Sequence, residues 1–245
     1  MKRLFTFGCS FTQFMWPTWA DIIASNNSYD LYENWGRSGS GNLFIFNSII
    51  ECNLKRKFTV DDDIFVMWAT IHRDDGYRDG KWTGNGGVPA EVILTTGRWD
   101  MQGYQLRDMA FIYAIDQLMY STGCNLQMMS TTDLTDMTST GSNHQDMLTL
   151  YKPTIQDIAE LYTPILNKIH PSVHKVCYNN NWRTRPWFRE DNSHPGPGVY
   201  MEYLEKIFGP GYISDSTKNT VDIWEKLYVK DNWELPARSH LFKRW

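Results

Sequence analysis

Three residue types that together can carry out nucleophilic catalysis lie near opposite ends of this sequence. Ser10 follows a largely apolar run at residues 4–9, and Asp191 and His194 lie three positions apart, directly before Pro195. A serine hydroxyl is a weak nucleophile until a neighbouring base accepts its proton, and a carboxylate can hold that base in a fixed orientation. These residues therefore supply the groups that Ser-His-Asp acyl transfer requires.

His194 is the strongest candidate for the base. It is the only one of the six histidines with a carboxylate at a spacing suited to orient it, because a turn or short helical segment points such a pair to one side. Pro195 also restricts the backbone of the residue before it. Alternatively, these residues simply begin a helix, with Asp191 or Ser193 capping its N–H groups and His194 merely adjacent.

A glycine-rich segment at residues 34–42 has the sequence Asn-Trp-Gly-Arg-Ser-Gly-Ser-Gly-Asn. Glycines let a backbone approach a ligand closely and direct N–H groups at an oxygen that gains negative charge. A turn of this kind before a helix could equally bind phosphate, although it lacks the Gly-Lys-Ser/Thr ending of a P-loop. A plain connecting turn is the third interpretation.

Apolar patterning predicts strands that alternate with helices along most of the chain. Strands are expected at residues 4–8, 30–34, 63–69, 125–129 and 173–178. Helices are expected at residues 19–24, 42–51, 106–120, 154–168 and 199–207. This alternation predicts an α/β fold, a three-layer α/β/α sandwich with a central parallel sheet. Sites in such folds lie at the carboxyl ends of the strands.

The length of 245 residues fits a single domain spanning residues 1–245. Polar insertions are expected near residues 72–104 and 130–150, and a tail whose structure the pattern does not predict begins at about residue 210.

Composition limits the partners and the compartment. The net charge of −4 argues against a nucleic-acid partner. The N-terminal apolar run is too short for a signal peptide, and no stretch is long enough to span a membrane. We therefore expect a soluble protein that is cytoplasmic or virion-associated. The four cysteines show no CxxC spacing, so reduced thiols are expected rather than a zinc site. The 15% of aromatic residues could pack a core or stack on sugars.

Three ordered blocks of the sequence resemble the SGNH, or GDSL-like, hydrolases. Residues 7–12 resemble the first block, with Cys9 where Asp is common, and residues 34–39 are similar to the second. Asp191-x-x-His194-Pro195 matches the last block. The resemblance implies a flavodoxin-like fold in which Ser10 is the nucleophile, His194 the general base and Asp191 its orienting acid. It also places the backbone N–H groups of Ser10 and Gly39 in the oxyanion hole.

The sequence departs from the third block of the family. That block usually has the form Gly-x-Asn-Asp, and its Asn side chain donates to the oxyanion. When the strand is aligned from Asp63, Thr70 takes the place of the Gly and His72 that of the Asn. His72 could donate from a ring nitrogen and Thr70 from its hydroxyl. Asn42, just after Gly39, is another candidate donor. His72 could also be an ordinary loop residue.

Two further segments could contact a substrate. Arg73 begins a charged run at residues 73–79 that could bind a polar molecule, although such runs are commonly solvated loops. Trp187 lies in an aromatic and basic segment just before Asp191 and could form a pocket wall.

The expected function is hydrolysis of acyl esters, with acetyl groups on a carbohydrate as the substrate implied by the resemblance. Partners are then a small-molecule or glycan ester, with no metal or organic cofactor. The opening block also resembles uncharacterised family members of bacteriophages and marine bacteria, which implies a host surface polysaccharide. A binding or structural module without catalysis, and a lipid or thioester hydrolase, are the alternatives. The sequence does not indicate an oligomeric state.

Overall fold

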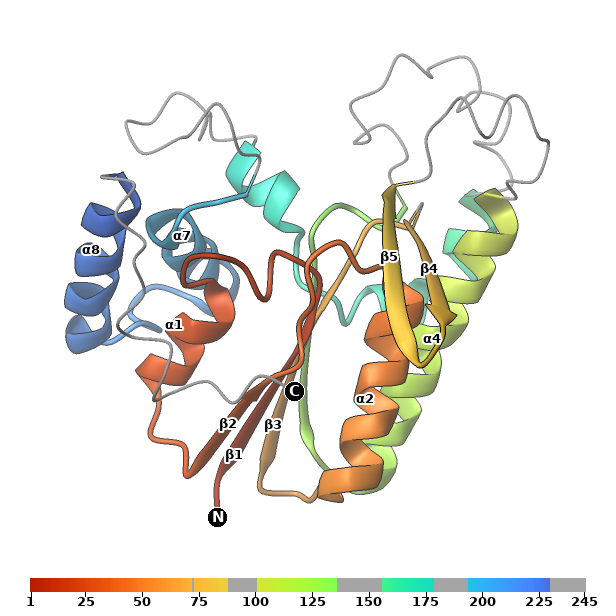
Figure 1. Cartoon of the computed structure of the whole chain (residues 1–245), viewed down its shortest axis with the longest axis horizontal. Coiled ribbons are helices and arrows are strands. Elements are labelled where there is room, and N and C mark those ends of the chain that lie inside the picture. Colours follow the sequence, from red (N-terminus) through yellow and green to blue (C-terminus); the bar gives the residue numbers. More distant parts are fainter. Residues whose placement is uncertain (72, 88–100, 136–155, 179–193, 230–245) are drawn as a thin grey trace.

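A computed structural model describes residues 1–71, 73–87, 101–135, 156–178 and 194–229 (Figure 1). Its main sheet has four strands in the order β2-β1-β3-β6, and every neighbouring pair is parallel. The strands are β1 (Arg3–Gly8), β2 (Leu31–Asn34), β3 (Asp62–Trp68) and β6 (Asn125–Ser130). The predicted α/β fold with a central parallel sheet is therefore confirmed.

The strand order explains where a site can form. The chain places β2 on one side of β1 and then crosses to place β3 on the other side. Connections that leave β1 in opposite directions open a crevice at its carboxyl end. Ser10 comes two residues after the end of β1 and lies at this crevice.

Helices cover both faces of the sheet (Figure 1). One face carries α2 (Asn42–Arg56) and α4 (Met101–Thr122). The other carries α1 (Trp19–Asn26), α7 (Pro197–Phe208) and α8 (Asp215–Val229).

Alternating side chains of the strands supply both hydrophobic cores. Phe5, Phe7 and Val66 pack in the core with α2 and α4. Leu4 and Met67 pack in the core with α1 and α7. Because successive side chains of a strand point to opposite faces, a strand covered on both sides must be apolar throughout.

An antiparallel hairpin occupies the start of the first expected insertion. It consists of β4 (Arg73–Arg78) and β5 (Lys81–Gly87). Asp79 and Gly80, which join them, have φ angles of 51° and 73°. Two consecutive residues with positive φ form the tight turn that suits the twist of a hairpin. The sequence predicted only a polar insertion near residues 72–104 and did not predict this hairpin.

The strand expected at residues 173–178 is wrong. These residues form a helical turn of the π type, η2 (His174–Tyr178). Val173 and Cys177, four residues apart, are both buried in the core with α7, and that spacing suits a helix rather than a strand. The outer edge of β6 carries one isolated bridge, between Met128 and Ile169.

Two other expectations change in detail. The helix expected at residues 154–168 is interrupted at Tyr162, after which α6 (Thr163–Leu166) begins with Pro164 in its first turn. The tail contains the 15-residue helix α8, which packs on α7 and α1.

No helix within the described ranges is both long and apolar enough to cross a membrane. All four cysteines are free thiols.

Candidate active site

Ser10 and His194 meet at the carboxyl end of the sheet, although they are 184 residues apart in the chain. The Nε2 atom of His194 lies 2.7 Å from the Oγ atom of Ser10. This distance is within the range required for a base to take a proton from a hydroxyl. The pair can therefore act as a nucleophile with its general base.

A tight turn presents Ser10. The N–H groups of Thr12 and Gln13 both donate to the carbonyl oxygen of Cys9, at 2.9 and 3.1 Å. A Cβ atom on Gly8 would lie 2.0 Å from the Oγ1 of Thr12 and 2.9 Å from the carbonyl oxygen of Met67. Only glycine fits at this contact, so Gly8 allows the chain to turn immediately after β1.

The glycine-rich segment is joined to the same turn. The carbonyl oxygen of Gly8 accepts the N–H of Arg37 at 3.0 Å, and the hydroxyl of Ser38 donates to the carbonyl oxygen of Gln13 at 3.1 Å. Gly39 has φ of +79°, and a Cβ atom there would contact nothing within 4 Å. The backbone of Gly39 is therefore held beside the Ser10 turn and has open space next to it.

Aromatic rings enclose the imidazole of His194. Phe14 stacks on it with ring centroids 4.0 Å apart, and Phe11 lies at 5.1 Å. Burial, and after it the positive charge of Arg73, lowers the pKa of His194 to about 4. The imidazole is consequently neutral at pH 7 and able to accept a proton.

Residues from two other elements hold the segment that follows His194. Trp16 donates from its indole nitrogen to the carbonyl oxygen of Pro195 at 2.9 Å. Glu225 of α8 accepts the N–H of Gly198, in the first turn of α7, at 2.7 Å. Tyr228 packs edge-on against Trp16, at 4.9 Å between ring centroids. Sequence reasoning missed all three side chains.

Asn42 does not provide an oxyanion donor in this structure. Its amide nitrogen donates to the carbonyl oxygen of Ala69 at 3.0 Å and to the carboxylate of Asp108 at 2.7 Å, while its amide oxygen accepts the N–H of Ala69. Both amide hydrogens are thus used, and the side chain is fully buried. Asn42 joins α2 to the end of β3 and to α4.

Asp108 is the partner that holds Asn42 in place. Burial raises the pKa of Asp108 to about 6, against the opposing effects of Arg107 and Asn42.

A carboxylate from the hairpin plays a comparable part at the start of α2. Asp75 accepts the N–H groups of Gly41 and Phe44 at 2.7 and 2.9 Å, so it caps a helix whose N-cap glycine has no side chain. Sequence analysis did not single out this role of Asp75.

Arg73 lies against the glycine-rich segment. Its Nη1 atom donates to the carbonyl oxygen of Ser40 at 3.0 Å, and a Cβ atom on Gly41 would be 2.7 Å from the Cβ of Arg73.

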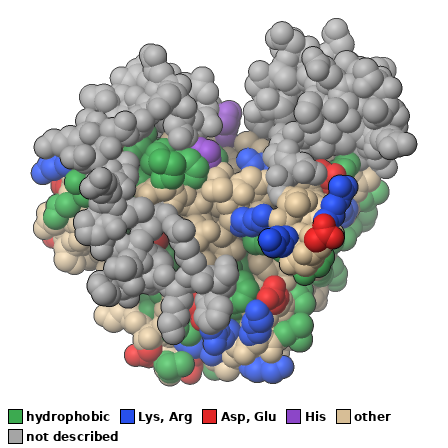
Figure 2. Space-filling model, viewed as in Figure 1, with side chains coloured by type: hydrophobic (Ala, Val, Ile, Leu, Met, Phe, Trp, Pro, Cys, Tyr) green, Lys and Arg blue, Asp and Glu red, His purple; other side chains and the backbone are tan. Residues whose placement is uncertain are grey.

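Thr70 is half-buried and lies two residues after the end of β3. The other candidates, Asp191, His72 and Trp187, lie outside the described residues. In the space-filling view, histidine and Lys or Arg side chains lie near one another on the upper part of the visible face (Figure 2).

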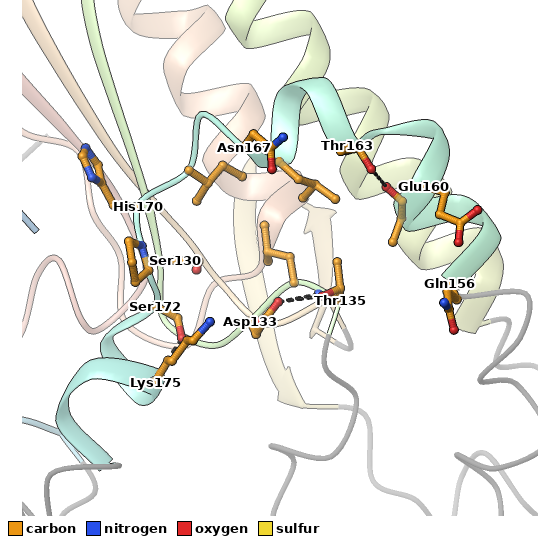
Figure 3. Close-up of a pocket in the computed structure, with 15 residues that line it drawn as sticks. Ser130, Asp133, Thr135, Gln156, Glu160, Thr163, Asn167, His170, Ser172 and Lys175 are labelled. Atoms are coloured by element: carbon orange, nitrogen blue, oxygen red, sulfur yellow. Dashed lines mark hydrogen bonds between the residues drawn. The ribbon is translucent and has the colours of Figure 1, made fainter.

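A separate cavity of about 430 Å³ lies beyond the end of β6. Its lining comes from the end of β6, the segment that follows it, and the helical region around α6 (Figure 3). Asp133, Glu160 and Lys175 supply charged groups there. Neither Ser10 nor His194 lines this cavity, so it is distinct from the reactive pair.

No protein family model matches the chain, and no curated protein matches it. Several solved structures are similar. A member of the lipolytic G-D-S-L family from Veillonella parvula is 15% identical over 85% of this chain and 98% of its own, with a TM-score of 0.47. An acetylxylan esterase from Geobacillus stearothermophilus is 11% identical over 87% and 97%, with a TM-score of 0.44. An esterase from Pseudoalteromonas is 10% identical over 85% and 97%, with a TM-score of 0.44.

Proposed function

We propose that this protein is a serine esterase. The observation that carries the proposal is the contact of 2.7 Å between the Ser10 hydroxyl and a half-buried, neutral His194. The Ser10 oxygen attacks the acyl carbon while its proton passes to Nε2 of His194. Collapse of the tetrahedral intermediate expels the alcohol, which takes that proton, and leaves the acyl group on Ser10. Water then attacks the acyl-enzyme with His194 again as base, releasing the acid and restoring Ser10.

In this proposal, backbone N–H groups of Ser10 and Gly39 stabilise the oxyanion, and Asp191 orients His194. The support for Gly39 is its open position in a loop tied to the Gly8 carbonyl beside the Ser10 turn. Each such donor contributes a few kcal/mol to the transition state. The third donor is His72 or Thr70, since Asn42 has no free amide hydrogen.

We assign small acyl groups, acetyl above all, on a carbohydrate as the substrate class, with a host surface polysaccharide as one source. The support is the resemblance of the sequence blocks to the SGNH hydrolases. Rates with acetylated sugars and with longer acyl esters test this class, because a preference for long chains would assign the protein to lipid chemistry instead.

Labelling with a fluorophosphonate tests the serine mechanism. We expect the wild-type protein to be labelled at Ser10 and Ser10→Ala to lose both the label and ester hydrolysis. Ser121→Ala, which removes an exposed hydroxyl from α4, is the matched control and should be labelled normally. Absence of labelling in a folded wild-type protein would support a binding or structural module in place of an enzyme.

A further inference from the structure

Arg73 is a half-buried cation without a carboxylate partner in the described part of the chain. Its guanidinium donates a hydrogen bond to a backbone carbonyl, that of Ser40, which neutralises no charge. Arg37 also donates to a carbonyl, that of Trp82, but its guanidinium lies over the ring of Phe44. The other half-buried arginines that the structure describes form ion pairs, namely Arg3 with Asp62, Arg56 with Glu33 and Arg107 with Asp108.

The carboxylates closest to Arg73 in the sequence have other partners. Asp75 accepts the two N–H groups at the start of α2. Asp74 is hydrogen-bonded to the hydroxyl of Tyr104. The charge of Arg73 therefore acts on its surroundings, and His194 is one of the groups that it affects.

The charge of Arg73 opposes the positive charge that ester hydrolysis develops on His194. His194 becomes an imidazolium in the transition state, and a nearby guanidinium disfavours that charge. A negative group bound to Arg73 would offset the repulsion. Arg73 has further N–H donors beyond the one that Ser40 accepts, and a guanidinium fork matches the geometry of a carboxylate.

We propose that Arg73 binds a carboxylate on the alcohol part of the substrate, so that the protein selects negatively charged esters. The proposal rests on the esterase function proposed above. It adds a specificity-determining residue and a substrate class: acetyl esters of acidic alcohols, such as those of acidic sugars. Arg73 lies beside the Gly39 loop, so a group held there sits next to the proposed oxyanion site.

Hydrolysis of matched ester pairs tests the proposal. The probes are 3- and 4-acetoxybenzoate and the corresponding uncharged acetoxybenzamides, compared by the ratio of their kcat/KM values. A hydrogen bond between charged groups predicts that the wild-type protein prefers at least one benzoate by about tenfold to a hundredfold. The ratio should fall close to one in Arg73→Gln, recover in part in Arg73→Lys, and decrease with added salt. Arg78→Gln, which removes an exposed cation from the same strand, should keep the wild-type ratio.

Two results would overturn the proposal. One is a wild-type ratio at or below one for both isomers. The other is an Arg73→Gln variant that loses the same factor on charged and uncharged esters, because that result would assign Arg73 to the oxyanion instead. Calorimetric titration of Ser10→Ala with the same compounds measures binding without turnover. Tighter binding of the benzoates there, lost in the double variant with Arg73→Gln, would support the anion site even if fluorophosphonate labelling refuted the esterase.

Discussion

The indole N–H of Trp16 donates to the carbonyl oxygen of Pro195 at 2.9 Å, across 179 residues of sequence. Trp16 belongs to the segment that follows Ser10, and Pro195 comes directly after His194. The bond is buried, so no solvent competes for either group. It therefore fixes the distance between the segments that carry Ser10 and His194.

Replacing Trp16 with Phe should slow ester hydrolysis. The variant keeps an aromatic ring but leaves the buried Pro195 carbonyl without its donor, at a cost of about 1–3 kcal/mol. A displaced His194 should lower kcat by about tenfold or more, because catalysis is sensitive to small misplacements. Trp19→Phe is the control, since Trp19 is equally buried but its indole N–H has no hydrogen-bond partner among the described residues. Urea denaturation and kcat should show both variants destabilised and only Trp16→Phe slowed; equal kcat values would contradict the role of this bond.

The rate should persist to unusually acidic pH. His194 acts as a base only when neutral, and burial followed by the charge of Arg73 lowers its pKa to about 4. The kcat/KM for an uncharged ester should therefore stay level as the pH falls from 7 to 5, then drop about tenfold per pH unit below about 4. Arg73→Gln removes one of the two causes and should move this acidic limb to higher pH, whereas Arg78→Gln should not. A wild-type midpoint near 6.5 would refute the low pKa.

Glu225 should make stability depend on pH. Burial raises its pKa to about 7, although the bond from Gly198 opposes the shift. The folded state thus binds a proton that the unfolded state releases above about pH 4.5. This contribution is fully present below that pH and is lost as the pH rises through about 7, amounting to about 3 kcal/mol.

The variant Glu225→Gln keeps an oxygen for the Gly198 N–H but cannot ionise. The free energy of unfolding, measured in urea at pH 5 and pH 8, should therefore decrease less with pH than in the wild-type protein. Glu51→Gln alters an exposed side chain and should follow the wild type. Identical pH dependence in Glu225→Gln and wild type would show that Glu225 is ionised throughout this range.

Alanine should be tolerated at Gly39 but not at Gly8. At Gly8 the added Cβ would meet Thr12 and the Met67 backbone, so we expect a loss of about 3 kcal/mol or more. At Gly39 the space is open, and the positive φ alone costs about 1–2 kcal/mol. Thermal unfolding followed by circular dichroism compares the two. A Tm for Gly8→Ala as high as that of Gly39→Ala would contradict the close contact.

Much of the fold was predictable because strands and helices differ in apolar periodicity. The strand β3 appeared as an uninterrupted apolar run, which is typical of a strand buried on both faces. The apolar run at residues 173–178 was too short to distinguish a strand from a helix. A strand was expected there, and the structure has the helical turn η2 instead. The Asp79-Gly80 pair is a hairpin signal, but the polar residues around it favoured an insertion. The helix α8 was not predicted, because most of its residues are polar.

The candidate site was less accessible to sequence reasoning. Residue types and positions indicated that Ser10 and His194 could work together. The sequence could not show that Ala69 and Asp108 occupy the amide of Asn42, because those contacts depend on how α2, β3 and α4 pack. The same holds for Trp16 and Glu225, whose partners are backbone groups distant in sequence.

The support of α7 by α8 has a consequence for synthesis on the ribosome. The turn that presents Ser10 involves residues near the start of the chain and can form early. Glu225 and Tyr228 emerge more than two hundred residues later, and until then the first turn of α7 lacks its capping carboxylate and the ring of Tyr228 does not yet pack against Trp16. Contacts between such distant residues form late in folding. Ser10, the proposed nucleophile, is therefore held against His194 by all of these contacts only after synthesis has passed residue 228.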